Sequence, residues 1–234
     1  MVPQLPFSHR PSSSMLICSM ASGAKHLEML AITGLTFKLY AQFHQMDCLL
    51  LTNQRLDPSR PPAWDKVALL HEMSRKYKIV LWVDSDSIIR IPFPDIRDEL
   101  YGHYPMYLAR QDLNQVPNTG VWVVRGTDEA RSMLKEIWNN TAYLYHPWWE
   151  QGALMDLMGF RFTGNPNPHE GLSFAANPWG ERVGRLDTKW NSCDSKQTEY
   201  TVIKHYCGLL NQGDVLNWLH SDYHHFLSLA GNGP

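Results

Sequence analysis

Residues 79–86, with the sequence IVLWVDSD, constrain the fold most, because five apolar residues run directly into two carboxylates. An unbroken apolar run of this length is typical of a strand buried on both faces of a sheet. Asp84 and Asp86 then lie at the carboxyl end of that strand, where open α/β sheets bind ligands. Two carboxylates so close repel each other unless a cation neutralises them, so we predict a Mn2+ or Mg2+ site. The alternative is a turn with two solvated aspartates.

The composition sets the class of protein. A length of 234 residues with 44% hydrophobic residues suits one α/β domain with a sizeable core. A net charge of −2 gives no indication of nucleic acid or an anionic membrane surface as a partner. No stretch reaches the length of a membrane span, and the first residues lack the apolar run of a signal peptide or anchor, so we expect a soluble chain. The many aromatic residues either fill the core and surface or line a sugar-binding cleft.

The cysteines are few and widely spaced. Cys18, Cys48, Cys193 and Cys207 form no Cys-x-x-Cys motif, which argues against a structural zinc site. A disulfide between Cys193 and Cys207 and four free thiols both remain open. The sequon at residues 139–141 is usable only if the chain enters the secretory pathway.

Apolar spacing and turn residues predict an alternation of strands and helices. Strands are predicted at residues 15–20, 47–52, 79–83, 106–110, 119–124 and 201–206, and helices at about 25–45, 63–77, 96–101, 127–138 and 149–158. This order predicts βαβ units and a parallel sheet. Residues 1–13 are predicted to be a disordered lead-in, 14–212 one domain, and 213–234 a helical tail. Residues 159–187 are expected to be rich in loops.

The turn at residues 19–23 opens a helix and is a candidate for holding a nucleotide base and ribose. The sequence has no Gly-x-Gly-x-x-Gly and no Walker loop, which disfavours dinucleotide-binding and P-loop enzymes. An octahedral cation needs more ligands than two aspartates, and His205, at the end of a predicted strand, is the best distant candidate. Gly208 behind it would let a phosphate approach the backbone. The alternative for His205 is a core or surface histidine. His220, His224 and His225 are predicted to be surface or packing residues, with a metal role as the less favoured alternative.

Two further segments combine polar side chains with an element boundary. Asn118-Thr119-Gly120 precedes a predicted strand and is either turn chemistry or an amide placed against a substrate hydroxyl. Trp148-Trp149-Glu150-Gln151 opens a predicted helix. This second segment is either a favourable acidic helix start or a polar site behind an aromatic wall.

Five motifs occur in one order: Trp64-Asp65-Lys66, Leu81 to Ser87, Asn118 to Val121, Trp149 to Leu154, and His205 to Gly208. In this order they resemble the metal-dependent nucleotide-sugar glycosyltransferases with the GT-A fold. The most similar family is that of the galactosyl/mannosyl/xylosyltransferases. It includes fungal α-1,2-galactosyltransferases, α-1,6-mannosyltransferase subunits and plant xyloglucan α-1,6-xylosyltransferases. The resemblance covers residues 14–210 and implies a Rossmann-like α/β fold with a mostly parallel central sheet flanked by helices.

The resemblance implies a role for each matching residue. Asp84-Ser85-Asp86 corresponds to the motif that binds Mn2+ with the ribose and diphosphate of the donor. His205 corresponds to a distal metal ligand, and Gly208 to the glycine near the diphosphate. Asp86 is accordingly expected to be essential for catalysis.

The donor sugar is assigned to a second group of residues by the same resemblance. Lys66 corresponds to a basic residue that faces the donor, and Asn118 and Gly120 to a segment that lines the donor sugar. Glu150 and Gln151 correspond to an acidic residue and a glutamine beside the anomeric carbon. The family retains the anomeric configuration, with the leaving phosphate taking the proton of the acceptor.

The implied donors are UDP-galactose, UDP-xylose and GDP-mannose, and the implied acceptor is a glycan or glycoconjugate in the Golgi. Trp148, Trp149, Trp190-Asn191 and residues 165–178 are candidates for the acceptor side. Two positions depart from the family pattern: Gly152 stands where Asp or Ser is usual, and Cys207 precedes Gly208 instead of following it. A non-catalytic sugar- or nucleotide-binding protein on the same fold therefore stays open. A phosphatase of the haloacid-dehalogenase type, which also places Asp-x-Asp after an apolar strand, is the third hypothesis.

Overall fold

The computed structural model describes residues 1–3, 8–111, 115–162, 172–193, 198–208 and 214–231. A sheet of six strands in the order β2-β1-β3-β6-β5-β9 forms its centre. The strands are β1 (Met15–Ala21), β2 (Asp47–Thr52), β3 (Ile79–Val83), β5 (Met106–Arg110), β6 (Pro117–Arg125) and β9 (Val183–Leu186). Three of the five neighbouring pairs are parallel, and only β6 runs antiparallel to its neighbours. The predicted α/β class with a mostly parallel sheet is confirmed.

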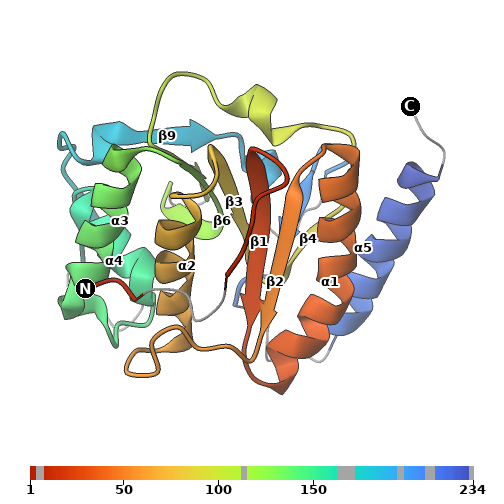
Figure 1. The fold of residues 1–234 in the computed structure, drawn as a ribbon, viewed down its shortest axis with the longest axis horizontal. Helices are drawn as coiled ribbons and strands as arrows, with labels where there is room; N and C mark the ends of the chain where they lie inside the picture. Colours follow the sequence, from red (N-terminus) through yellow and green to blue (C-terminus); the bar gives the residue numbers. More distant parts are fainter. Residues whose placement is uncertain (4–7, 112–114, 163–171, 194–197, 209–213, 232–234) are drawn as a thin grey trace.

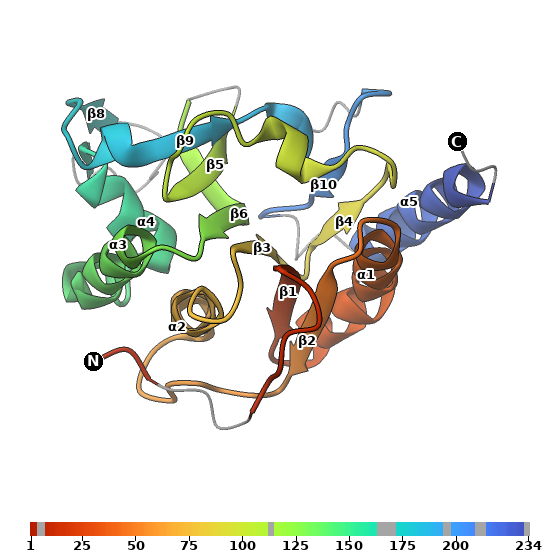
Figure 2. The ribbon, with the colours of Figure 1, turned by 45° about the horizontal axis from the view of Figure 1, so that its top comes forward.

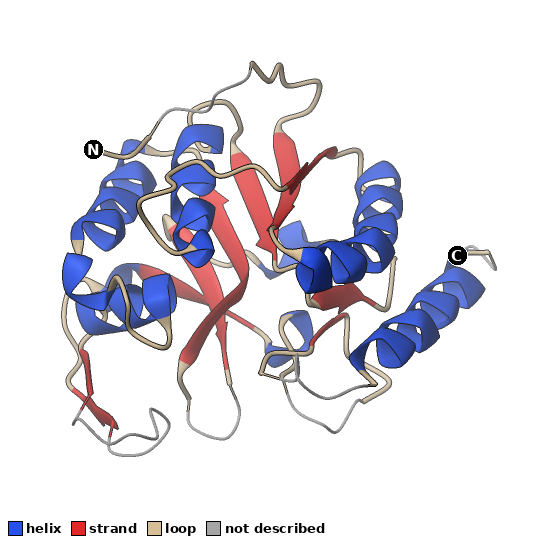
Figure 3. Cartoon of the chain, turned by 90° about the horizontal axis from the view of Figure 1, so that it is seen from below, coloured by secondary structure: helices blue, strands red, loops and turns tan. Residues whose placement is uncertain are grey.

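Helices cover both faces of this sheet (Figures 1 and 3). They are α1 (Ala24–Phe43), α2 (Asp65–Met73), α3 (Asp128–Asn139), α4 (Trp149–Leu157) and α5 (Val215–Ala230). Single 3₁₀ turns lie at Pro62–Trp64, Ile96–Glu99, Thr141–Tyr143, Gly180–Arg182 and Thr188–Trp190. Figure 1 shows α2, α3 and α4 on one side of the sheet and α1 and α5 on the other. Among the described residues, no helix is both long and apolar enough to cross a membrane.

The apolar run of β3 is explained by these two layers. Val80 and Trp82 belong to the cluster that packs against α2, α3 and α4, whereas Leu81 and Val83 belong to the cluster on the α1 side. Successive side chains of a strand point to opposite faces, so a strand covered on both faces is apolar at every position.

A short sheet beside the central one brings the distal histidine to the aspartates. β4 (Ser87–Ile89) follows the Asp84–Asp86 turn directly and pairs antiparallel with β10 (Ile203–His205). In this register His205 lies opposite Ser87. Figure 2 shows the two strands next to each other beyond the end of β3. The topology, and not sequence proximity, therefore sets the distance between His205 and Asp86.

Several predicted element boundaries are corrected. Strand β10 is shorter than the predicted residues 201–206 and pairs with β4 instead of joining the central sheet. The predicted loop region 159–187 contains β9 as well as the hairpin of β7 (Phe160–Phe162) and β8 (Leu172–Phe174). β9 has no strong apolar pattern and forms because its backbone pairs with β5. Residues 163–171 lie outside the described residues.

The two ends of the chain contact the domain. Of the lead-in, residues 4–7 are not described, but the Ser12 amide donates to the Asp47 carboxylate at 2.8 Å. The predicted tail helix is present as α5, which buries Leu219 and Phe226 and packs against α1. Gly213 and residues 232–234 of the predicted tail lie outside the described residues.

Candidate active site

Three side chains with metal-ligating atoms converge at the carboxyl end of β3. One such atom each from Asp84, Asp86 and His205 all lie within 4.8 Å of one another. His205 Nε2 is 3.3 Å from Asp86 Oδ1 and 3.9 Å from Asp84 Oδ2. Octahedral Mg2+ with ligands at about 2.1 Å places neighbouring ligand atoms about 3 Å apart. The three side chains therefore fit one face of such a site with small adjustments.

The electrostatics of the same trio also suit a cation. Burial opposes ionisation of Asp86, but His205 outweighs it and lowers the pKa of the Asp86 carboxyl. Burial likewise disfavours protonated His205, but Asp86, Cys207 and Asp84 together outweigh it and raise the pKa of His205 to about 9. The two side chains thus form a buried ion pair whose proton a divalent cation would replace, since metal ligands bind deprotonated.

Lys66 from α2 connects this trio to α4. Its Nζ lies 2.8 Å from Asp84 Oδ1 and 3.0 Å from Glu150 Oε1, and it donates to the Thr119 carbonyl at 3.2 Å. Burial opposes its charge, but Asp84 and Glu150 outweigh burial and raise the pKa of Lys66 above its ordinary value. Trp82 Nε1 also donates to Asp84 Oδ1, at 2.6 Å, so this oxygen is held by two donors.

Glu150 has one oxygen in use and one that is buried without a hydrogen-bond partner among the described residues. Its Oε1 accepts from Lys66 and from the Thr119 hydroxyl at 3.1 Å. Its Oε2 is buried and has no hydrogen-bond partner within the described part of the chain. Burial raises the pKa of Glu150, and Lys66 opposes this only in part. A buried carboxylate oxygen without a partner is costly, so this oxygen is a candidate acceptor for a ligand.

Gln151 lies beside Glu150 and is anchored to β6. Its Oε1 accepts from the Thr119 amide at 3.1 Å. The structure therefore brings Lys66, Thr119, Glu150 and Gln151 together next to the aspartates, as the resemblance implied for three of them. Thr119, which contacts the other three, was not predicted as a site residue because nothing marks a threonine at a strand start as functional.

Asn118 and Gly120 contact the histidine ligand. A Cβ atom on Gly120 would lie 2.1 Å from His205 Cε1, so only glycine leaves room for the ring. Asn118 Oδ1 accepts from the Gly120 amide at 2.8 Å and from Asn191 Nδ2 at 2.9 Å. The predicted role of both residues was to line the donor sugar, whereas the contacts present here support His205.

Ser85 and Gly208 flank the ligands. Ser85 Oγ lies 3.0 Å from His26 Nδ1, and its carbonyl accepts from the Thr33 hydroxyl at 3.1 Å. Gly208 has φ of 74°, a left-handed conformation that favours glycine, and a Cβ atom there would meet nothing within 4 Å. The backbone after β10 is therefore open at this point.

The candidates for the acceptor side divide into three groups. Trp149 is 44% exposed, whereas Trp148 packs against His146 and Phe162. Trp190 and Asn191 are buried, so their predicted place on an acceptor-facing surface is wrong. Residues 165–171 of the third candidate lie outside the described residues.

Gly152 and the histidines of the tail have structural explanations. A Cβ atom on Gly152 would lie 2.9 Å from His146 Nδ1, so the Asp or Ser usual in the family would crowd this ring. His220, His224 and His225 are exposed on α5, as predicted.

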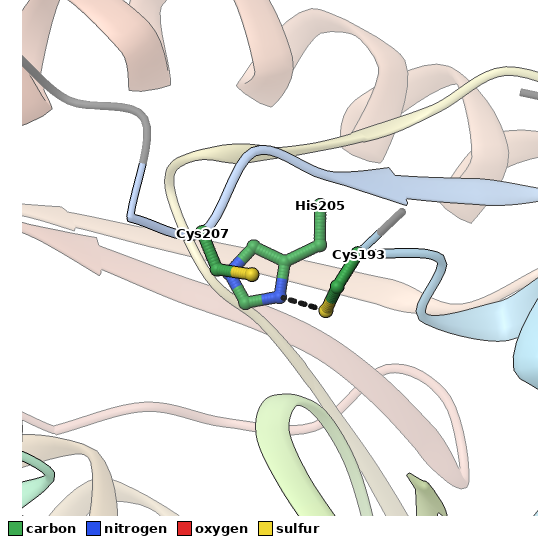
Figure 4. A group of neighbouring side chains, drawn as sticks. All are labelled: Cys193, His205 and Cys207. Atoms are coloured by element: carbon green, nitrogen blue, oxygen red, sulfur yellow. Dashed lines mark hydrogen bonds between the residues drawn. The ribbon is translucent and has the colours of Figure 1, made fainter. Parts of the chain in front are cut away.

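All four cysteines are free thiols. Cys193, His205 and Cys207 nevertheless form a second group whose ligand atoms lie within 4.8 Å of one another (Figure 4). The sequence has no Cys-x-x-Cys motif and so gave no indication of this group. The two thiols meet because Ser192, next to Cys193, bridges to Lys204 of β10.

Comparison with known proteins rests on structure. No family model matches the sequence, and no curated protein matches it. A glycosyltransferase involved in the glycosylation of the major capsid of PBCV-1 is 14% identical with a TM-score of 0.65, over 89% of this chain and 100% of that chain. Galactosyltransferase LgtC, in complex with donor and acceptor sugar analogues, is 13% identical with a TM-score of 0.56, over 93% of this chain and 96% of that chain.

A third similar structure is glycosyltransferase GlyE of Streptococcus pneumoniae TIGR4. It is 11% identical with a TM-score of 0.57, over 96% of this chain and 64% of that chain. Likeness at these identities establishes the fold. The chain therefore has the GT-A fold of these glycosyltransferases, and Asp84, Asp86 and His205 converge at the carboxyl end of its β3.

Proposed function

We propose that this protein is a metal-dependent glycosyltransferase. It moves a hexose or pentose from a nucleotide-diphosphate sugar to a glycan or glycoconjugate acceptor. The observation that carries the proposal is the convergence of Asp84, Asp86 and His205 at the end of β3, beside the buried pair of Lys66 and Glu150. The GT-A fold supports the same conclusion, because other proteins with this fold are glycosyltransferases.

Asp84, Asp86 and His205 would hold Mn2+ or Mg2+. When bound, such an ion acts as a Lewis acid on the diphosphate leaving group. Lys66 contributes a second, fixed positive charge next to Asp84, in a site where burial strengthens its field. Ser85 and Gly208 adjoin the ligands, and we assign them to the ribose and diphosphate of the donor.

The sugar would lie against α4 and the start of β6. The unused Oε2 of Glu150 accepts a hydrogen bond from a hydroxyl of the donor sugar, and Gln151 lies beside the anomeric carbon. Asn118 and Gly120 support the site from behind, through His205. The reaction retains the anomeric configuration, and the leaving phosphate takes the proton of the acceptor hydroxyl. NMR of the product distinguishes this outcome from inversion.

The test is Mn2+-dependent hydrolysis of a panel of donors. UDP-galactose comes first because one similar structure is a galactosyltransferase, followed by UDP-xylose and GDP-mannose. Asp86→Ala is expected to reduce turnover at least about 100-fold, because it removes a metal ligand. Asp98→Ala, which changes an exposed aspartate in the turn after β4, is the matched control and is expected to be unchanged.

Each other outcome selects another function. Metal-dependent donor binding without turnover would favour the binding protein on the same fold. Release of phosphate from simple phosphomonoesters would favour the phosphatase. If the protein shows no donor turnover and no metal-dependent donor binding, the proposal that it is a glycosyltransferase is overturned.

We place the protein in the Golgi or secretory pathway. Asn139, the acceptor of the sequon, is exposed at the end of α3 and is therefore accessible to a glycan. Expression in the secretory pathway should produce a mass that falls on treatment with an N-glycosidase, and Asn139→Gln should abolish that change. A secreted protein without such a glycan would contradict use of the sequon.

A further inference from the structure

A chain of buried amide groups joins the start of β6 to the far side of His205. Asn118 Oδ1 lies 2.9 Å from Asn191 Nδ2, and Asn191 Oδ1 lies 3.0 Å from His205 Nδ1. All three residues are at most 5% exposed, so water does not compete for these contacts. We call this chain the amide relay.

The direction of every hydrogen bond in the amide relay follows from a backbone group. The Gly120 amide only donates, so the Asn118 atom at 2.8 Å from it is the carbonyl oxygen. Asn118 Oδ1 therefore needs a donor on Asn191. The same Asn191 nitrogen lies 3.3 Å from the Asn118 backbone carbonyl, which also accepts, so this nitrogen is the amide NH2. Asn191 must therefore present its oxygen to His205, and that oxygen accepts only from a protonated Nδ1.

The imidazole ring of His205 has no room to rotate and exchange the partners of its two nitrogens. It packs on the Cα of Gly120, where even a methyl group would overlap it. A backbone hydrogen bond holds His205 against the segment that carries Asn191, because the His205 amide donates to the Ser192 carbonyl at 2.9 Å and Ser192 adjoins Asn191. Trp190, fully buried, anchors the preceding turn. With the proton of Nδ1 committed to Asn191, Nε2 faces Asp86 Oδ1 and Asp84 Oδ2 and is the nitrogen that would give up its proton to a cation.

The thiols are the competing partners of Nδ1. Figure 4 shows Cys193 and Cys207 near the ring of His205, with Cys193 Sγ at 3.6 Å from Nδ1. A tetrahedral zinc ion would place sulfur and nitrogen ligands about 3.5 Å apart, so this geometry is compatible with a soft metal on Nδ1. The Asn191 oxygen is nearer at 3.0 Å and is the stronger acceptor. Nδ1 cannot both donate a proton to Asn191 and bind a metal with the thiols, so an experiment can distinguish the two.

We propose that Asn191 is a positioning residue for the metal site: through the amide relay it keeps the proton of His205 on Nδ1 and presents Nε2 to a divalent cation held with Asp84 and Asp86. This role rests on the proposed function, because it requires a cation at the aspartates. Partners of a metal-binding histidine that fix its tautomer typically contribute 10- to 100-fold in metal affinity. In the proposed site Asn191 contacts His205 and contributes no ligand atom, so it would act through His205.

The first experiment measures Mn2+ affinity by electron paramagnetic resonance of the free ion, without donor or acceptor. Asn191→Leu removes the acceptor of Nδ1 at similar volume and is expected to weaken Mn2+ binding about 10- to 100-fold. Asn191→Asp keeps an acceptor for Nδ1 while opposing Asn118 Oδ1, so it should lose thermal stability and yet bind Mn2+ within a few-fold of the unchanged protein. A purely structural role would weaken binding in both variants in proportion to their loss of stability. Cys193→Ser is the control near the same nitrogen and should bind Mn2+ normally.

The second experiment needs no variant. In protein with ¹⁵N-labelled histidine and bound Mg2+, the spectrum of His205 should show the proton on Nδ1 and none on Nε2. The opposite tautomer would overturn the proposal, as would equal Mn2+ affinity in Asn191→Leu and the unchanged protein. Stoichiometric Zn2+ that is lost in Cys193→Ser and that displaces the Nδ1 proton would assign the nitrogen to the thiols instead. Failure of the unchanged protein to bind Mn2+ would overturn the metal site, whereas normal binding in Asn191→Leu would overturn the role of Asn191 alone.

Discussion

Two buried ion networks lie on either side of the Asp84–Asp86 turn, and they are completed differently. In the site network, Lys66 pairs with Asp84 and Glu150. In the tail network, Asp222 of α5 accepts from Arg90 Nε at 2.8 Å with one oxygen and from the Tyr206 hydroxyl at 2.6 Å with the other. Both oxygens of Asp222 are used, whereas Oε2 of Glu150 has no partner among the described residues.

The difference separates a structural network from one prepared for a ligand. The tail network ties α5 to the residue after β4 and to Tyr206, next to the ligand His205, and every oxygen of its carboxylate is satisfied within the chain. A buried ion pair whose hydrogen bonds are all made adds little net stability, but removing one partner is strongly destabilising. The site network keeps charge and an unused acceptor in a buried position, which lowers stability, and under the proposed function that acceptor serves the donor sugar.

Asp222→Ala should have the largest effect on stability, because it leaves the buried Arg90 without its partner. Breaking a buried pair in this way costs about 3–5 kcal/mol in the free energy of unfolding. Urea denaturation measures it. Asp128→Ala is the matched control: Asp128 pairs with Arg131 but is fully exposed at the start of α3, so only a small loss of stability, well below that of Asp222→Ala, is expected. Equal effects of the two substitutions would show that the tail network is not the structural one.

Glu150→Gln should have the opposite profile. Loss of the charge is expected to reduce donor turnover about 100-fold, or about 2.7 kcal/mol, because the acceptor is preorganised in a buried site. Stability should respond to pH. The folded pKa of Glu150 is raised, so its contribution to stability is fully present below the unfolded pKa of about 4.3 and is lost as pH rises through the folded value.

Relative to the unchanged protein, Glu150→Gln should therefore gain in free energy of unfolding as pH rises from about 4 through the folded pKa of Glu150. Denaturation at a series of pH values measures this difference. A relative stability that falls over the same interval would mean that Lys66 stabilises ionised Glu150 more than burial opposes it, and the contrast between the two networks would disappear.

Thr127→Ala should have the smallest effect and calibrates the other two. The Thr127 side chain accepts from the Ala130 amide at 3.2 Å at the start of α3, away from both networks. Loss of an N-cap costs about 1 kcal/mol. Thermal denaturation should show this decrease with donor turnover unchanged at temperatures where the protein is folded. A loss of turnover would indicate that α3 is coupled to the site.

Local patterns in the sequence predict much of the scaffold. The apolar run before Asp84 predicted β3 with both faces covered, and the helix predicted at residues 127–138 is α3, which the Thr127 side chain caps. Both predictions rest on interactions within a few residues, such as the alternation of side chains along a strand or a hydroxyl on the amide three residues later. The Asp-x-Asp motif was placed at a strand end for the same reason.

Resemblance to a known family added residues that no local pattern distinguishes. Lys66 and Glu150 are ordinary helix residues in the sequence, and their ion pair appears only when α2 and α4 pack on one face of the sheet. Gly120 was assigned to the donor sugar, yet the ring of His205 occupies the space that a side chain would need. Asn191 was placed on the acceptor side, although it lies buried behind the metal ligand.

The sequence by itself determined the strand that ends in two carboxylates, the helices on either side and the α/β class, because these depend on periodicity and capping over short distances. The tertiary structure alone decided that β10 pairs with β4, which brings His205 to Asp86, and that Ser192 bridges to Lys204, which brings Asn191 and Cys193 to the ring of His205. The physical reason is that β pairing between segments far apart in the sequence is selected by the packing of the whole sheet and its helices, which no short pattern encodes.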